Sequence, residues 1–131
     1  HTGSAHATRH HGGVAGHAAY VTGKSALLGL TRSMAIDYGP HNIRVNAVAP
    51  GNVVTNMTAG LSGGAQAAHD RALARNPLPY VCTTEDIADA FAYLAGPSAR
   101  GITGQVLVID SGLSVAVVPP AYHQGNTGFV D

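Results

Sequence analysis

Residues 18–51, AAYVTGKSALLGLTRSMAIDYGPHNIRVNAVAPG, contain the pattern that decides the fold. The first part is rich in Ala, Leu and Met, which favour helices, and its apolar residues recur at helical spacing. We expect a long helix over 18–38 that the Gly-Pro pair at 39–40 terminates. The apolar, β-branched segment 43–49 then predicts a short buried strand, which ends in a Pro-Gly turn at 50–51.

A second helix and strand follow in the C-terminal part. Thr83 and Asp86 have the spacing of a capped helix start, so we expect a helix from there to about Ala95, before Gly96-Pro97. Gln105–Ile109 is a second apolar strand. Helices that alternate with short buried strands indicate parallel βα units. Residues 58–79 are rich in Gly and Ala and show only weak helical character, so their structure stays open.

Composition limits the classes of function. The 131 residues suffice for one domain, and 45% hydrophobic against 11% charged residues favours a globular chain. The net charge of zero predicts no nucleic-acid partner and no anionic membrane partner. The apolar runs are too short to span a bilayer, and the first residues do not form a signal peptide. With one cysteine, Cys82, we expect no internal disulfide, and cytoplasmic residence is the default expectation.

The chemistry centres on Tyr20 and Lys24, the latter being the only lysine in the sequence. Residues four apart on a helix lie side by side. A positive charge beside a phenol favours the phenolate, and such a tyrosine can exchange a proton with a carbonyl or an alcohol. Taken alone, this spacing is also compatible with an ordinary surface pair.

The wider context resembles a known family. The stretch from Tyr20 to Met57, the helix start at Thr83–Ala88 and the strand at Ile102–Gly112 together resemble the short-chain dehydrogenase/reductase family. The resemblance implies an α/β fold, namely the C-terminal portion of an NAD(P)-binding, Rossmann-type, doubly wound parallel sheet. We expect that domain to cover residues 1–115 and a C-terminal tail to cover 116–131.

The resemblance also implies roles for individual residues. Tyr20 would be the general acid/base, and Lys24 would favour its ionised form and hydrogen-bond the nicotinamide ribose of NAD or NADP. The turn containing Pro50, Gly51, Val53 and Thr55 would bind the nicotinamide carboxamide through the backbone near Val53 and the Thr55 hydroxyl. A plain turn, followed by a helix that Thr55 caps, is the alternative.

The family's catalytic serine is harder to locate. The usual position is occupied by Ala7, whereas Ser4 lies in a fitting Thr-Gly-Ser-Ala context. A three-residue insertion in the following loop, 10–16, would explain this displacement, because loops tolerate insertions. Ser4 would then orient the substrate oxygen. The alternative is that Ser4 only ends a strand in a degenerate active site.

The histidines of the first segment invite a metal hypothesis. His6 and His10 are four apart, with His11 and His17 nearby, and this spacing suits a shared metal only on a helix. The glycines at 12–13 favour a loop, and the resemblance implies no catalytic metal. We therefore expect a polar loop and no metal site.

The main hypothesis is an NAD(P)-dependent oxidoreductase that acts on a small alcohol or carbonyl substrate, as a homodimer or homotetramer. The Gly-rich phosphate-binding turn, the residue that selects NAD or NADP and a catalytic asparagine would then lie before His1. The rival hypothesis is a non-catalytic, truncated member of the family or a pseudo-enzyme subunit. A third keeps the fold and changes the reaction to that of a dehydratase or an epimerase.

Overall fold

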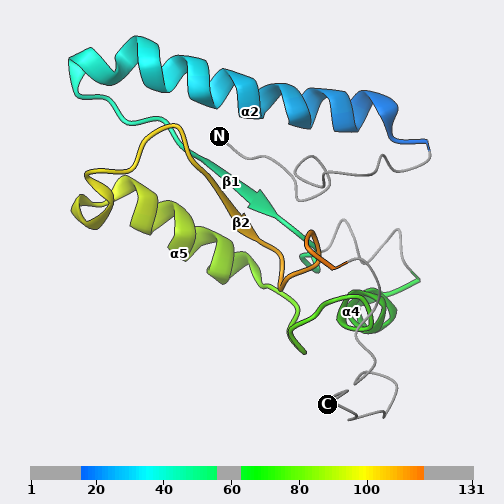
Figure 1. Cartoon of the computed structure of the whole chain (residues 1–131). Helices are drawn as coiled ribbons and strands as arrows, with labels where there is room; N and C mark the ends of the chain where they lie inside the picture. Colours follow the sequence, from blue (N-terminus) through cyan, green and yellow to red (C-terminus); the bar gives the residue numbers. More distant parts are fainter. Residues whose placement is uncertain (1–15, 56–62, 117–131) are drawn as a thin grey trace, which may run out of the picture.

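The computed structural model of the chain describes residues 16–55 and 63–116 (Figure 1). Along the chain it contains helix α2 (Ala18–Tyr38), the 3-10 turn η1 (Gly39–His41), strand β1 (Ala47–Pro50), helix α4 (Ala65–Leu73), helix α5 (Thr84–Ala95), the 3-10 turn η2 (Pro97–Ala99) and strand β2 (Val106–Ile109). No helix among these described residues is long and apolar enough to cross a membrane.

The two strands form a parallel pair at the centre of the fold. Ala47 lies opposite Val106, and Pro50 lies opposite Ile109. Figure 1 shows α2 on one side of the strands and α5 on the other. This arrangement of helix, parallel sheet and helix confirms the predicted α/β architecture.

The core lies mainly between the sheet and α5. Val48 is fully buried and packs with Ala90 and Leu94 of α5, and the partly buried Ile87, Ile102 and Ile109 surround this cluster. Ala47 and Ala49 alternate with Val48 in β1, so they point to the face opposite α5, and their small side chains let α2 approach that face closely.

The predicted helix boundaries are confirmed. α2 covers Ala18–Tyr38, as its apolar spacing indicates, and buries Thr31 and Ala35. α5 begins with the expected capping box. The Asp86 amide donates to the Thr83 hydroxyl at 3.3 Å, and the Asp86 carboxylate accepts the Thr83 amide at 2.7 Å. Both otherwise unsatisfied backbone donors thereby gain partners.

The predicted start of the first strand was wrong. The strand predicted from residue 43 begins only at Ala47, and Ile43 is 50% exposed. The reason is that the Val45 amide donates to the Thr103 hydroxyl at 3.0 Å, a side chain that interrupts the backbone ladder. Helix α2 ends at Tyr38 as predicted, and the 3-10 turn η1 follows it up to Asn42, which takes the left-handed conformation with φ 58°.

The Gly- and Ala-rich segment, for which the sequence left the structure open, contains α4. Gly64 precedes this helix with φ 109°, a conformation that suits glycine. The predicted strand Gln105–Ile109 begins one residue later, at Val106.

Candidate functional site

The candidate site lies at the carboxyl ends of the strands. Figure 1 shows that β1 points toward the end of the molecule at which α2 begins, because the helix and the strand run in opposite directions. In open parallel sheets, ligands bind beyond the carboxyl ends of the strands. The first turns of α2 and the segment after β1 are therefore the parts of the described chain that such a ligand would meet.

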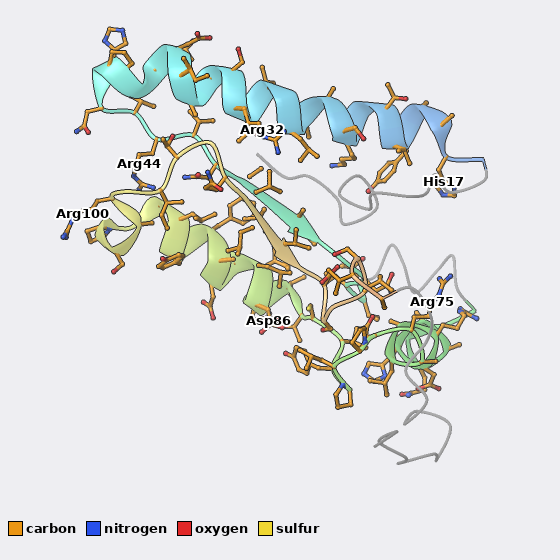
Figure 2. All side chains as sticks on the ribbon, viewed as in Figure 1. His17, Arg32, Arg44, Arg75, Asp86 and Arg100 are labelled. Atoms are coloured by element: carbon orange, nitrogen blue, oxygen red, sulfur yellow. The ribbon has the colours of Figure 1, made fainter. Side chains whose placement is uncertain are left out.

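Tyr20 and Lys24 form one pair on consecutive turns of α2. The Lys24 ammonium nitrogen lies 5.8 Å from the centre of the Tyr20 ring. Tyr20 is 50% exposed, so its ring is accessible to a ligand. His17, at the start of α2 in Figure 2, meets the same ring edge-on with 6.4 Å between ring centres. The predicted phenol and ammonium are thus neighbours on a helix, as their spacing indicates.

The segment Pro50–Thr55 leaves the end of β1 as a half-buried turn. The Gly51 amide donates to the Ile109 carbonyl at 2.9 Å and so continues the strand pairing by one residue. Val53 then forms an isolated parallel bridge with Cys82. The turn is therefore fixed at two points, and the residues between them follow the sheet edge.

Gly51 is the point of closest backbone approach. A Cβ atom at Gly51 would lie 2.5 Å from the Cβ of Asp110 and 2.7 Å from its Cα. Such separations are far below van der Waals contact, so only glycine fits here. The Pro-Gly pair thus serves close packing of the turn on the end of β2, besides ending the strand.

The residues Asp110–Ser114 form a second turn that the sequence did not identify as part of the site. The buried Asp110 carboxylate accepts the Gly112 amide at 2.9 Å and the Ser114 amide at 2.6 Å. Ser111 has a left-handed backbone with φ 54°, and its hydroxyl lies 3.4 Å from the Cys82 sulfur. Because Cys82 also forms the bridge with Val53, it connects this turn to the turn after β1.

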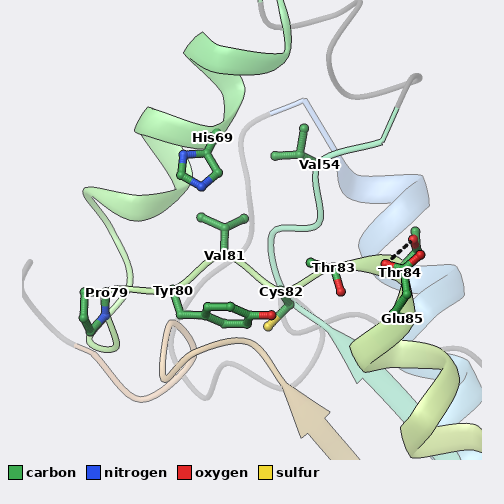
Figure 3. Close-up of a pocket in the computed structure, with 9 residues that line it drawn as sticks. All are labelled: Val54, His69, Pro79, Tyr80, Val81, Cys82, Thr83, Thr84 and Glu85. Atoms are coloured by element: carbon green, nitrogen blue, oxygen red, sulfur yellow. Dashed lines mark hydrogen bonds between the residues drawn. The ribbon is translucent and has the colours of Figure 1, made fainter.

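A pocket of about 460 Å³ opens between α4 and the start of α5. Figure 3 shows His69 on α4 and Val54 of the Pro50–Thr55 turn above Tyr80, Cys82 and the first residues of α5. The pocket therefore adjoins the turn after β1. It is lined by Val54, His69, Pro79, Tyr80, Val81, Cys82, Thr83, Thr84 and Glu85.

Electrostatics in this pocket centre on the capping box of α5. The Tyr80 hydroxyl donates to the Asp86 carboxylate at 2.7 Å, and this hydrogen bond raises the pKa of Tyr80. The Thr83 amide, followed by the Tyr80 hydroxyl, lowers the pKa of Asp86. Backbone and Thr84 hydrogen bonds lower the pKa of Glu85. The start of α5 therefore presents ionised carboxylates at neutral pH, which suits the positive end of a helix dipole.

The structure groups most of the predicted site residues. It places Tyr20 beside Lys24, and Pro50, Gly51, Val53 and Thr55 on one turn at the same end of the sheet. Ser4 lies outside the described residues, as do the histidines at 6, 10 and 11. The Asp110–Ser114 turn was missed because its partners, Gly51 and Cys82, are far away in the sequence. The only local signal was the left-handed conformation that an Asp-Ser-Gly triplet allows.

Two comparisons with known proteins decide the family. The sequence family described as enoyl-(acyl carrier protein) reductase matches residues 4–114. The structure of a short-chain type dehydrogenase/reductase from Mycobacterium ulcerans superposes with a TM-score of 0.76 and 28% identity, over 94% of this chain and 43% of that one. The chain belongs to the short-chain dehydrogenase/reductase family.

Other members of the short-chain dehydrogenase/reductase family are more similar in sequence. The A-factor type gamma-butyrolactone 1'-reductase (1S-forming) of Streptomyces virginiae is 39% identical over 98 residues, which are 75% of this chain and 38% of that protein. The structure of 4-hydroxyisoleucine dehydrogenase complexed with NADH and succinate matches with a TM-score of 0.72 and 33% identity, over 88% of this chain and 45% of that one. The chain thus spans less than half the length of these relatives.

Proposed function

We propose that these residues carry the proton-transfer site of an NAD(P)-dependent oxidoreductase that interconverts an alcohol and a carbonyl compound. The observation that supports this most directly is the Tyr20–Lys24 pair on α2, in which the Lys24 ammonium nitrogen lies 5.8 Å from the centre of the Tyr20 ring. The pair lies on the helix that begins toward the carboxyl end of the parallel strands. The relatives add support, because one is named as a reductase and another as a dehydrogenase complexed with NADH. The substrate would be a small molecule.

The donors around the turn after β1 suit a nicotinamide nucleotide. The Thr55 hydroxyl and the backbone amides near Val53 can donate to a carboxamide, and the Lys24 ammonium can donate to ribose hydroxyls. Pro50 and Gly51 keep this turn against the end of β2, so the donors are fixed before a ligand arrives. The nucleotide, NAD or NADP, supplies or removes the hydride.

Tyr20 would exchange the proton. In the reducing direction its hydroxyl donates to the carbonyl oxygen, and in the oxidising direction its phenolate accepts the alcohol proton. Lys24 would place its ammonium group beside the Tyr20 ring during this exchange. Ser4 would orient the substrate oxygen by a hydrogen bond from its hydroxyl.

We further propose a cytoplasmic homodimer or homotetramer. Helix α2 leaves Leu30 and Ile36 exposed by 47% and 76%, and such apolar residues suit contact with a second subunit. Residues 1–115 would belong to the catalytic domain and residues 116–131 to a tail.

The decisive test replaces Tyr20 by Phe in the natural, full-length protein. With saturating NADH or NADPH and a panel of carbonyl substrates, we expect turnover to fall by about 10²–10⁴-fold, the usual value of a lost general acid. Tyr38→Phe is the matched control, because Tyr38 lies on the same helix, is 43% exposed and stands at its opposite end. Deuterium-labelled nicotinamide should transfer its label to the product.

The outcomes separate the rival functions. A Tyr20→Phe variant with unchanged turnover would refute the proposed role of the phenol. Product formation without transfer of the label would favour a dehydratase or an epimerase. A wild-type protein that binds neither nucleotide and reduces no carbonyl would support a non-catalytic member of the family.

A further inference from the structure

We infer that Ser111 is a positioning residue that fixes the Pro50–Thr55 turn relative to the segment that enters α5. This inference rests on the proposed function for its consequence in catalysis. Its structural basis is that Ser111 contacts Leu78 and Cys82, while Cys82 and the residues just before Ser111 contact the turn after β1. Three parts of the chain are thereby linked around Ser111. These are the turn after β1, the segment 77–83 and the turn after β2.

The first contact is through the Ser111 backbone. Ser111 is 8% exposed and has φ 54°. A left-handed residue other than glycine costs roughly 1–2 kcal/mol. Its carbonyl accepts the Leu78 amide at 3.0 Å, and the flanking Asp110 carboxylate accepts the Gly112 amide. Ser111 makes these contacts in the left-handed conformation, which glycine adopts without the steric cost of a Cβ.

The second contact is through the Ser111 side chain. Its hydroxyl lies 3.4 Å from the Cys82 sulfur, and both residues are buried. Cys82 forms the parallel bridge with Val53. The hydroxyl therefore supports the strand segment that fixes the middle of the proposed nicotinamide turn.

The third contact secures the beginning of the same turn. Gly51 donates to the Ile109 carbonyl at 2.9 Å and lies directly against the backbone of Asp110, the neighbour of Ser111. The turn is thus held at Gly51 by the residues before Ser111, and at Val53 through the Ser111 side chain. A glycine at 111 would satisfy the backbone better but would remove the second of these supports.

This difference between backbone and side chain provides the test. Ser111→Gly relieves the left-handed strain and removes the hydroxyl, whereas Ser111→Ala removes the hydroxyl and keeps the strain. A positioning role predicts that both variants raise the KM for the nicotinamide nucleotide by about 2–10-fold, the range expected for one lost buried hydrogen bond. For Ser111→Gly we expect a raised KM together with a thermal midpoint equal to or above that of the wild type, because this variant relieves the backbone strain.

A second readout needs no nucleotide. Amide hydrogen exchange of a peptide covering 50–55 in the nucleotide-free, full-length protein should be at least about threefold faster in both variants, because its support is lost. Cys82→Ala should give the same change. The double variant Ser111→Ala, Cys82→Ala should add little to either single variant, since both remove one contact.

Each outcome bears on one of the two proposals. The positioning role is overturned if the amides of 50–55 exchange at the wild-type rate in both Ser111 variants. It is also overturned if the KM for the nucleotide rises only in variants with a lower thermal midpoint. If exchange accelerates as expected but the wild-type protein binds neither NADH nor NADPH, the positioning role stands and the proposed function fails.

Discussion

The two ends of the β1–β2 pair are built in different ways. At the amino end, side chains bind backbone groups. At the carboxyl end, the Asp110 carboxylate also accepts backbone amides, but the distinctive contact is the close packing of the Gly51 backbone against the Cα and Cβ of Asp110. This difference separates the part of the fold that supplies stability from the part that, in the proposed function, binds the nucleotide.

Arg44 dominates the amino end. Its guanidinium donates to the carbonyls of Leu94 at 2.6 Å and Ala95 at 3.2 Å, the last residues of α5, and also to those of Gly96 and Ile102 at 3.3 Å. A cation at a helix C-terminus suits the negative end of the helix dipole. Asn46 adds two hydrogen bonds to the backbone. Its side-chain nitrogen donates to the Ile102 carbonyl, and its side-chain oxygen accepts the Gln105 amide.

The carboxyl end relies on precise fit. A long side chain such as that of Arg44 can adjust by rotation about its bonds, whereas a glycine packed against the Cα and Cβ of another residue cannot. A fixed turn suits a binding site, because donors that are already in place lose little entropy when a ligand arrives. Substitutions at the amino end should therefore affect stability first, and those at the carboxyl end should affect binding in addition.

The largest effect on stability should follow Arg44→Met. Removal of a partly buried guanidinium leaves several carbonyls without their charged donor, so we expect the free energy of unfolding to fall by about 2–4 kcal/mol. Arg100→Met is the control, because Arg100 lies nearby but is exposed, and its loss should cost less than about 0.5 kcal/mol. Urea unfolding of the three proteins measures this. Equal urea midpoints for Arg44→Met and Arg100→Met would contradict the proposal that Arg44 stabilises the amino end.

A smaller loss of stability should follow Gly51→Ala, with a loss of binding as well. The new methyl group would lie 2.5 Å from the Asp110 Cβ, and relief of such overpacking costs about 1–3 kcal/mol. The shifted turn should also bind the nicotinamide nucleotide more weakly, as nucleotide titration would show. Gly29→Ala, inside α2 with open space around it, should instead stabilise the protein by about 0.5–1 kcal/mol. If Gly51→Ala lowers stability but leaves nucleotide affinity intact, the two ends do not differ in the proposed way.

The same contrast explains what the sequence could predict. The helix Ala18–Tyr38, the capping box at Thr83 and the Tyr20–Lys24 pair all depend on neighbours within four residues, and all were predicted correctly. The start of β1 was wrong because the partner that interrupts its ladder, Thr103, is 58 residues from Val45. The contacts of Gly51 with Asp110 and of Cys82 with Ser111 are equally non-local, and no periodic pattern encodes them. The roles proposed for Ser4, for the Tyr20–Lys24 pair and for Pro50, Gly51, Val53 and Thr55 stay predictions.

The smallest effect concerns the start of α5, which adjoins the carboxyl end of the sheet but is stabilised by a side chain. The Thr83 amide and the Tyr80 hydroxyl lower the pKa of Asp86, so the ionised carboxylate favours the folded state. This stability is present above the unfolded pKa, near 3.8, and is lost as the pH falls through the lower folded pKa. At pH 7, Asp86→Asn should therefore unfold at a lower urea concentration than the wild type. The difference between the two urea midpoints should be smaller at pH 3. Asp89→Asn, in the middle of the same helix, should show no comparable narrowing. If the difference in urea midpoint between the wild type and Asp86→Asn is the same at both pH values, the effect of the substitution is due to packing. The contrast between side-chain and backbone support would then apply only to the two ends of the sheet.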